Sequence, residues 1–291
     1  MHIPDRQQTT GMILGLIGVT IFGATLPMTH IALGGFSPLF ITFGRAVVAS
    51  AAAALALLLL RSRWPKGQGL TLLGAGICVV YGFPIFSSTA MQTIPASHGG
   101  VVLGLLPLLT SIFAALVDGE RPGTAFWAYG LAGAALVVLF SVRDSGFHLA
   151  IGDVWLFLAA VTASLGYVLS AKVSRIIAGW EVISWALVIT APLSIVATFL
   201  VAGSGIHAPS SGELWAFSYL GLMSMFGGFV FWNAGLAMGG TARVAQVQLL
   251  QTFVTLTISA FLLKEAVSLT TILFAMAVAT IVWLGRKARI A

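Results

Sequence analysis

The stretch ASHGGVVLGLLPLLTSIFAALVDGE, residues 96–120, has a similar counterpart, TARVAQVQLLQTFVTLTISAFLLKE, at residues 241–265. Each is an apolar run that ends in a glutamate, and the second follows the first by 145 residues. The same shift lays Gly82 on Gly227. Because similarity at a fixed period is typical of repeated structural units, we predict that the chain consists of two related halves.

The composition indicates that lipid surrounds most of this protein. Hydrophobic residues make up 59% of the 291 residues and charged residues only 8%, and the mean hydropathy is +1.05. A water-exposed surface needs about 25% charged residues, whereas an apolar run of about 20 residues crosses a bilayer as a helix. Ten such runs occur, near residues 11–33, 38–60, 70–91, 97–117, 125–141, 151–171, 181–203, 213–236, 243–263 and 268–285.

The ten runs divide evenly between the two halves. We predict an all-α integral membrane protein of ten transmembrane helices, with residues 1–145 as the first five-helix repeat and residues 146–291 as the second. An odd number of crossings in each repeat gives the two repeats opposite orientations in the bilayer. Inverted repeats are the architecture of carriers that open alternately to the two sides of the membrane.

The distribution of Lys and Arg predicts the orientation, because basic loops are retained on the cytoplasmic side. With the N-terminus inside, eleven of these residues fall in cytoplasmic segments and two, Arg143 and Lys264, in outer segments. We therefore expect a multi-pass protein of the bacterial inner membrane with both termini in the cytoplasm. The net charge of +6 forms no basic stripe, so we expect no nucleic-acid partner.

The sequence predicts neither a cofactor nor a metal site. Cys78 is the single cysteine and is expected to be a small buried hydrophobic residue. The absence of a Walker A motif argues against direct ATP drive. No acidic residue lies in the centre of a run, which argues against proton-driven export of organic cations. The lack of an HExxH motif and of a nucleophilic triad predicts that the chain is not an enzyme.

Several short motifs resemble the EamA-type repeat of the drug/metabolite transporter superfamily. They are Phe22-Gly23-Ala24, the arginine in Phe43-Gly44-Arg45-Ala46, Pro107 with Gly119-Glu120, and Lys264-Glu265. The resemblance covers essentially the whole chain and is greatest to the aromatic amino-acid exporter branch. It implies a ten-helix carrier whose central cavity is lined by helices 1, 3, 4, 6, 8 and 9. The second repeat departs from the pattern in having Thr252 where the first has Pro107.

The resemblance also implies what the carrier moves. We expect a small-molecule substrate, a neutral, hydrophobic or aromatic amino acid or related metabolite, exported by alternating access through the lipid bilayer. The alternatives are export of other small metabolites or drugs, a solute channel, and a membrane subunit with a purely structural role. The sequence contains no signal for a particular oligomeric state.

Polar residues inside apolar runs are costly and therefore tend to face a cavity or a neighbouring helix. On the ninth run they recur at helical spacing and form one stripe, and the sixth run carries a matching stripe. Both stripes can instead serve interhelical hydrogen bonding. With aromatic and polar residues of other runs, the predicted substrate-binding residues are Tyr81, Phe83, Ser88, His98, Ser164, Tyr167, Trp232, Gln248, Gln251, Thr252 and Thr255.

Three prolines within runs, Pro27, Pro84 and Pro107, are predicted to bend helices or to act in gating, because proline frees backbone carbonyls for other partners. Arg45 is the strongly basic residue well inside a run. It is interpreted either as an attractor of a substrate carboxylate or as a structural residue that pairs with carbonyls. The preferred interpretation of His98 is an interfacial histidine, and the alternative is a proton carrier.

Overall fold

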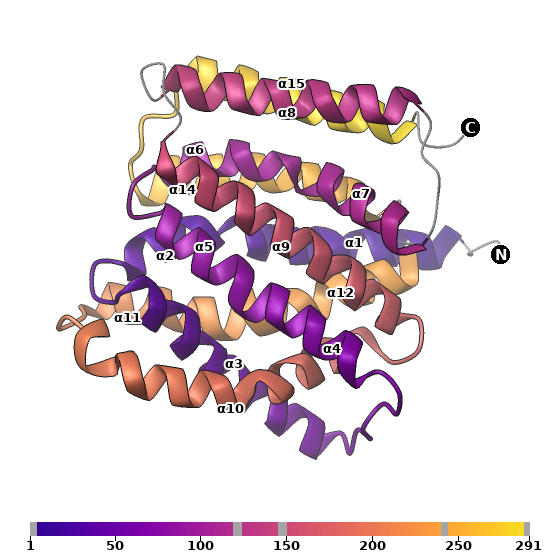
Figure 1. Cartoon of the computed structure of the whole chain (residues 1–291), viewed down its shortest axis with the longest axis vertical. Coiled ribbons are helices and arrows are strands. Elements are labelled where there is room, and N and C mark those ends of the chain that lie inside the picture. The colour runs from indigo at the N-terminus through magenta and orange to yellow at the C-terminus, as the bar shows by residue number, and fades with distance from the viewer. Residues whose placement is uncertain (1–4, 119–123, 145–149, 240–243, 288–291) are drawn as a thin grey trace.

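The computed structural model describes residues 5–118, 124–144, 150–239 and 244–287. Within these ranges every regular element is a helix, and the one strand-like pairing is a bridge between Phe36 and Ile206. The helices lie side by side in stacked layers (Figure 1). The all-α prediction is therefore confirmed for the part of the chain that the structure describes.

Seven helical stretches of the described chain are long and apolar enough to cross a membrane, and each coincides with a predicted run. They are Thr9–Ala32, Pro38–Leu59, Gly69–Ala90, Ala96–Val117, Ile151–Ser174, Gly179–Gly205 and Ser211–Gly239. Shorter apolar helices, Trp127–Phe140, Leu249–Leu262 and Leu269–Ile281, occupy the other three runs. The total of ten crossings stays a prediction, because it includes these shorter helices.

The first half of the chain contains three long helices and several shorter helical elements. They are α1 (Asp5–Gly23), α2 (Thr25–Ala32), α3 (Pro38–Leu59), α4 (Gly69–Gly76), the π-helix η1 (Ile77–Gly82), α5 (Phe83–Ala90), α6 (Ala96–Val102), the 3₁₀-helix η2 (Leu103–Leu105), α7 (Leu106–Asp118) and α8 (Thr124–Asp144). Helix α3 begins where it does because Ser37 accepts a hydrogen bond from the Phe40 amide at 3.3 Å and Pro38 occupies the first turn.

The second half follows the same order with fewer interruptions. Its elements are α9 (Ile151–Ser174), α10 (Gly179–Gly205), α11 (Ser211–Tyr219), the π-helix η3 (Leu220–Gly227), α12 (Gly228–Gly239), the 3₁₀-helix η4 (Ala245–Gln248), α14 (Leu249–Leu262) and α15 (Leu269–Lys287). Helix α11 starts with a capping box, in which the Ser210 hydroxyl and the Glu213 carboxylate each accept a hydrogen bond from the other residue's amide.

The two π-helices occupy equivalent positions in the two halves. A shift of 145 residues carries the whole of η1 onto residues 222–227, which lie inside η3. A π-helix is rare, so its presence at both equivalent positions is unexpected unless the two halves are related. This correspondence supports the prediction of two repeats.

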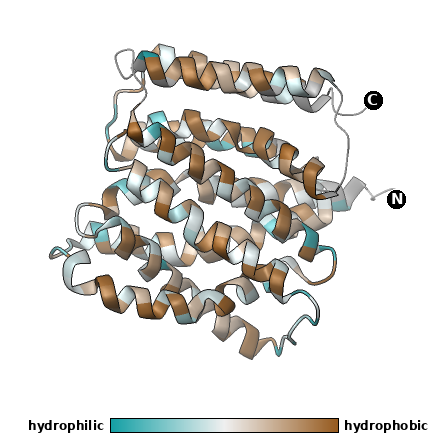
Figure 2. Ribbon diagram, viewed as in Figure 1, coloured by the Kyte–Doolittle hydropathy of each residue, from teal (hydrophilic) through white to brown (hydrophobic). Residues whose placement is uncertain are grey.

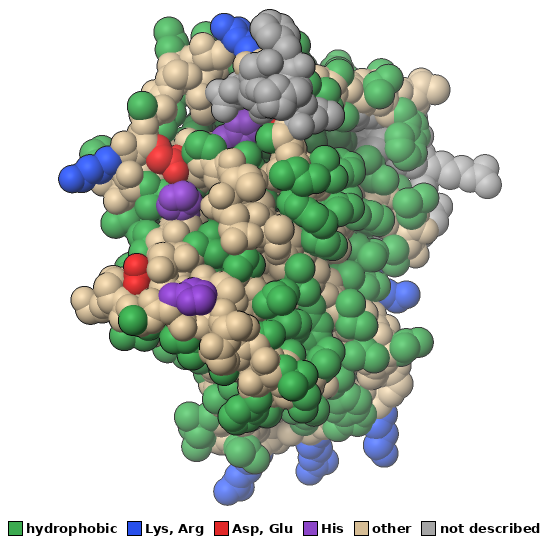
Figure 3. Space-filling view, turned by 60° about the vertical axis from the view of Figure 1, so that its left-hand side comes forward, with side chains coloured by type: hydrophobic (Ala, Val, Ile, Leu, Met, Phe, Trp, Pro, Cys, Tyr) green, Lys and Arg blue, Asp and Glu red, His purple; other side chains and the backbone are tan. Residues whose placement is uncertain are grey.

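The outside of the bundle is apolar. Hydrophobic residues run along the helices and hydrophilic residues gather at the ends and loops (Figure 2). Large apolar side chains such as Leu70, Phe199 and Phe261 are exposed, which is expected of a lipid-facing surface. Lys and Arg side chains project from the lower edge of the face in Figure 3. The first residues of α1 and the last residues of α15 lie at the same end of the bundle (Figure 1).

Helices α1 and α12 pack with their backbones almost in contact. A methyl group added at Gly235 would lie 2.7 Å from the amide nitrogen of Gly15 and 2.8 Å from the carbonyl oxygen of Gly11. Gly11 faces Gly239 in the same way, at 2.3 Å from its nitrogen. Small residues spaced four apart allow this approach in membrane helices, so the glycines join the first helix of one half to a helix of the other.

Candidate functional site

A small cavity lies between the two halves near the middle of the bundle. Each half contributes five lining residues: Phe22, Thr25, Arg45, Val79 and Phe83 from the first, and Ala163, Tyr167, Ser224, Phe229 and Gln251 from the second. The space open to water has a volume of about 20 Å³, which holds roughly one water molecule. The cavity must therefore widen before it can admit an organic solute.

The first membrane helix is broken beside this cavity. Pro27 has no amide hydrogen to donate to the carbonyl of Gly23, four residues earlier, and the Thr255 hydroxyl of α14 donates to that oxygen instead, at 2.8 Å. The Tyr219 hydroxyl of α11 donates to the Ile21 carbonyl at 2.9 Å. Both donors belong to the second half, so that half stabilises the break between α1 and α2, whose flanking residues line the cavity.

Arg45 is a buried cation at the cavity. It lies seven residues into α3, about 10 Å from the start of that helix, and only 2% of it is exposed. Its Nη2 donates to the Ser224 hydroxyl at 3.1 Å, and the Ser224 and Thr25 hydroxyl oxygens lie 2.8 Å apart in a further hydrogen bond. Nε and Nη1 have no hydrogen-bond partner among the described residues. Within that part of the chain, no acidic side chain lines the cavity to offset the positive charge of Arg45.

Close packing between η3 and α3 brings Ser224 to this arginine. A methyl group added at Gly221 would lie 2.9 Å from the Val48 side chain and 3.3 Å from the Arg45 carbonyl oxygen. The glycine lets the two helices approach, and Ser224 lies three residues further along the π-helix. Ser224 follows Val79 by 145 residues, so equivalent positions of the two π-helices both line the cavity.

Aromatic side chains form the apolar wall of the cavity. The ring centroids of Phe22 and Phe229 lie 4.9 Å apart, and those of Tyr167 and Phe229 lie 5.9 Å apart, both in edge-on arrangements. Trp232 packs against this wall, 5.9 Å from Tyr167, and its indole Nε1 is buried without a hydrogen-bond partner. Such a wall suits the aromatic or branched side chain of a solute.

Of the polar stripe on α14, Gln251 reaches the cavity. Its Oε1 atom is buried and has no hydrogen-bond partner. Gln248 is also buried, with neither amide atom paired, and Thr252 packs beside Gly104. Thr255 is engaged with the backbone of α1. The stripe therefore combines one cavity residue with residues that contact neighbouring helices.

The other predicted site residues lie at different places in the bundle. Phe83 and Tyr167 line the cavity. The Tyr81 hydroxyl bonds to the Thr190 carbonyl and the Ser194 hydroxyl of α10. Ser164 donates to the Leu106 carbonyl at 3.2 Å, and Ser88 is fully buried with an unpaired hydroxyl.

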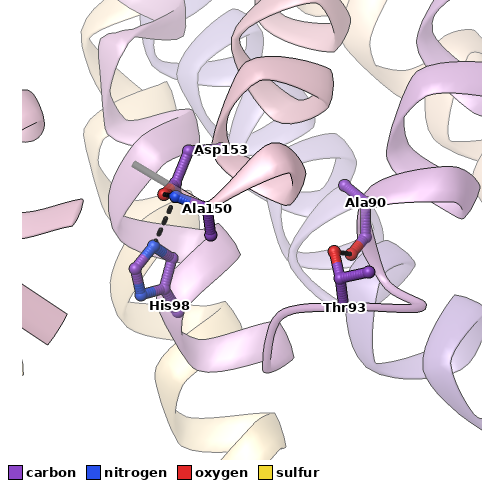
Figure 4. A network of polar contacts seen from close by, with 5 residues as sticks. All are labelled: Ala90, Thr93, His98, Ala150 and Asp153. Atoms are coloured by element: carbon purple, nitrogen blue, oxygen red, sulfur yellow. Dashed lines mark hydrogen bonds and ion pairs between the residues drawn. The ribbon is translucent and has the colours of Figure 1, made fainter. Parts of the chain in front are cut away.

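His98 belongs to a second buried polar cluster, where α6 and α9 begin. Its Nε2 lies 2.6 Å from Oδ1 of Asp153, and both side chains are almost fully buried. Oδ2 of Asp153 accepts from the Ala150 amide at 3.2 Å (Figure 4). Glu265 accepts from the amides of Ala96 and Ser97 at the start of α6. None of these residues lines the cavity. Their contacts instead join the start of α6 in the first half to the start of α9 and to Glu265 in the second half.

All three predicted helix-bending prolines lie beside a break in a helix or a change in helix type. Pro27 follows the break after α1, Pro84 follows η1, and Pro107 follows η2. Their predicted role in gating stays a prediction. Sequence reasoning missed the cavity residues Phe22, Thr25, Val79, Ala163, Ser224 and Phe229. The available signal was the 145-residue shift, which places Ser224 and Val79 at equivalent positions.

Among the described residues, no three His, Cys, Asp or Glu side chains gather as metal ligands would. Within the same part of the chain the cavity contains no group that would hold a cofactor by charge, apart from Arg45. The chemistry that the site offers is thus the non-covalent binding of a small solute with an anionic group and an apolar part.

Comparison with known proteins agrees with this description. The sequence matches the EamA-like transporter family twice, over residues 9–142 and 150–285. It is 41% identical over 263 residues to the uncharacterized transporter YdeK of Bacillus subtilis (strain 168), covering 90% of this chain and 92% of the relative. It is 30% identical over 236 residues to the aromatic amino acid exporter YddG of Ancylobacter novellus, covering 77% and 79%.

A solved crystal structure has the same fold, with a TM-score of 0.64 and 24% identity over 97% of this chain and 96% of that one. The family and both named relatives are transporters, which confirms the prediction of a multi-pass membrane transporter rather than an enzyme. Because the family match covers both halves and most of the chain, this protein belongs to the EamA-like transporter family.

Proposed function

We propose that this protein is a secondary transporter that exports neutral, hydrophobic or aromatic amino acids and related metabolites by alternating access. The observation that carries the proposal is the cavity beside Arg45, to which each half contributes five residues. A carrier binds its solute where its two repeats meet, so that opposite movements of the repeats expose the site to either side. Its aromatic wall and its polar residues suit an amphipathic solute.

The broken first helix supplies a hinge for alternating access. Its α1 arm packs on α12 through glycines, and its α2 arm packs on α11, α6 and α14. The largest contact of the α1 arm is with α12 and that of the α2 arm is with α11, while both arms also contact α14. The break between the arms lies at the cavity. Movement of one arm relative to the other would open one end of the cavity while the opposite end stays packed.

The aromatic wall is the basis for the proposed substrate class. Phe22, Tyr167 and Phe229 line the cavity, and the ring of Phe22 packs against the rings of both other residues. One relative is named an aromatic amino acid exporter, which agrees with a site of this kind. Gln251, with an unpaired amide oxygen beside the cavity, is proposed to hydrogen-bond the polar end of the solute.

The membrane arrangement is part of the same proposal. The chain would form ten crossings in two inverted repeats within a bacterial inner membrane, with both termini in the cytoplasm. Reporter fusions within residues 61–67 and 206–212 are expected to report opposite sides of the membrane. If both fusions report the same side, the proposed orientation is wrong.

A substrate screen in proteoliposomes tests the proposed function. Purified protein would be reconstituted, and uptake of radiolabelled aromatic, branched and small neutral amino acids would be measured against an internal excess of the unlabelled solute. Saturable counterflow of an aromatic or branched amino acid is the expected result. Large unitary currents would indicate a channel, and counterflow of unrelated drugs alone would indicate a different substrate class.

A further inference from the structure

Building on the proposed function, we infer that Arg45 binds the carboxylate of the transported solute and that the solute's ammonium group is not needed for recognition. The cavity is a carboxylate site with an apolar wall. It would accept an aromatic or branched carboxylic acid that lacks the amino group at least as well as the matching amino acid. It would reject the matching amide, which keeps the ammonium and lacks the carboxylate.

The guanidinium of Arg45 is largely unpaired within the described part of the chain. It presents five N–H donors, and the described structure supplies one acceptor, the Ser224 hydroxyl. Nε and Nη1 are buried without partners. A structural arginine inside a membrane protein pairs with carboxylates or backbone carbonyls, and this one does neither through those atoms. Its remaining donors are therefore available to a ligand.

The charge at the cavity is positive and favours an anionic ligand. The acidic side chains that the structure describes all lie at helix ends and have other partners there: Asp153 with His98 and Ala150, Glu181 with Ser62 and Ala178, Glu213 with Ser210, and Glu265 with Ala96 and Ser97. None lines the cavity. A ligand of charge −1 would neutralise Arg45, whereas a cationic ligand would add a second positive charge at low dielectric.

The cavity offers the ammonium group of an amino acid no anionic partner among the described residues. Apart from Arg45, the polar groups among the lining residues are the amide of Gln251 and the hydroxyls of Thr25, Tyr167 and Ser224, and the others are apolar side chains and aromatic rings. These polar groups are neutral acceptors, so they offset only part of the cost of removing an ammonium from water. A charge-assisted hydrogen bond from arginine to a carboxylate is the stronger interaction. Recognition is thus expected to depend on the carboxylate and the side chain.

Matched ligands test this inference by their effect on thermal stability and by competition with the labelled solute. The aromatic set is phenylalanine, 3-phenylpropionate and phenylalaninamide, and the branched set is leucine, 4-methylpentanoate and leucinamide. In at least one set, the acid without the amino group is expected to bind as well as the amino acid or better. The amide is expected to bind at least tenfold more weakly. An amide that binds as well as its acid, or no binding by the acids of either set, would overturn the inference.

Two substitutions connect the preference to Arg45. Arg45→Met should weaken binding of the acids at least tenfold and leave the unliganded unfolding temperature unchanged or higher, because an unpaired buried charge is replaced by an apolar chain of similar length. Arg45→Lys keeps the charge and should keep the order of the three ligands. If Arg45→Met binds every ligand as the original protein does, the inference is wrong. If Arg45→Met fails to fold, the order of the three ligands measured on Arg45→Lys and on the original protein still tests the inference.

The same experiments separate this inference from the proposed function. If amino acids show counterflow and the amide binds as well as its matching acid, the proposed export function stands and the carboxylate site is wrong. A different result is that the acids bind, that Arg45→Met abolishes this binding, and that no amino acid shows counterflow. In that case the carboxylate site stands and the proposed amino-acid export is wrong.

Discussion

The close approach of α1 and α12 makes Gly235 a position where a single methyl group should separate two helices. The added carbon in Gly235→Ala would lie 2.7 Å from the Gly15 nitrogen, whereas ordinary van der Waals contact begins at 3.4 Å. The neighbouring atoms are backbone and cannot rotate away. The helices must therefore move apart by about 0.7 Å, the difference between those two distances.

The magnitude follows from two opposing effects. Overpacking of this kind costs roughly 1–3 kcal/mol, while replacing glycine by alanine inside a helix stabilises it by up to about 1 kcal/mol. Gly203 in α10 is a matched control, because nothing lies within 4 Å of a methyl group added there. Gly203→Ala keeps the helix-propensity effect and lacks the clash, so the difference between the two variants measures the packing.

Thermal unfolding of the two purified variants in detergent is the assay. Gly235→Ala should unfold several degrees below Gly203→Ala, since 1 kcal/mol corresponds to roughly 2–4 °C in domains of 150–250 residues. Gly235→Val should lower the temperature further, because its larger side chain meets the same backbone. Equal unfolding temperatures for Gly235→Ala and Gly203→Ala would show that α1 and α12 do not approach as closely as described.

Three further outcomes are expected. Gln251→Ala should weaken solute binding several-fold, about the value of one hydrogen bond, with Gln7→Ala, exposed on α1, as the unaffected control. Thr255→Val, which removes the bond to the broken first helix, should cost about 1 kcal/mol of stability, whereas Thr257→Val, exposed and bonded within its own helix, should cost less. Transport should continue without a proton gradient, and a solute-dependent proton flux that His98→Ala abolishes would contradict this expectation.

The sequence alone was sufficient for the class of the protein. A hydrophobic run long enough to cross a bilayer forms a helix there, because lipid offers its backbone no hydrogen-bond partners. The helices coincide with the predicted runs. The shift of 145 residues pointed to two halves, and motifs such as Phe43-Gly44-Arg45-Ala46 and Lys264-Glu265 resembled the family that the comparisons identify. These properties depend on composition and on spacing along the chain, both of which a sequence contains.

The prediction of individual cavity residues from the sequence was less complete. Tyr167, Phe83 and Gln251 were predicted and line the cavity, whereas Thr255 was predicted and bonds to the backbone of α1. A polar stripe indicates which face of a helix is buried, but the same stripe can meet a cavity at one turn and a helix at the next. Gln251 and Thr255 are one turn apart on α14 and differ in this way.

Tertiary structure alone decided the surroundings of Arg45. Its hydrogen-bond partner among the described residues, Ser224, is 179 residues away along the chain. The π-helix η3 and the close packing at Gly221 bring it to the arginine. A π-helix has no reliable signal in composition or periodicity, because it depends on how neighbouring helices pack. Whether a buried cation is paired or left for a ligand depends on which groups the fold brings within 3.5 Å of it, and residues far apart in the chain determine those groups.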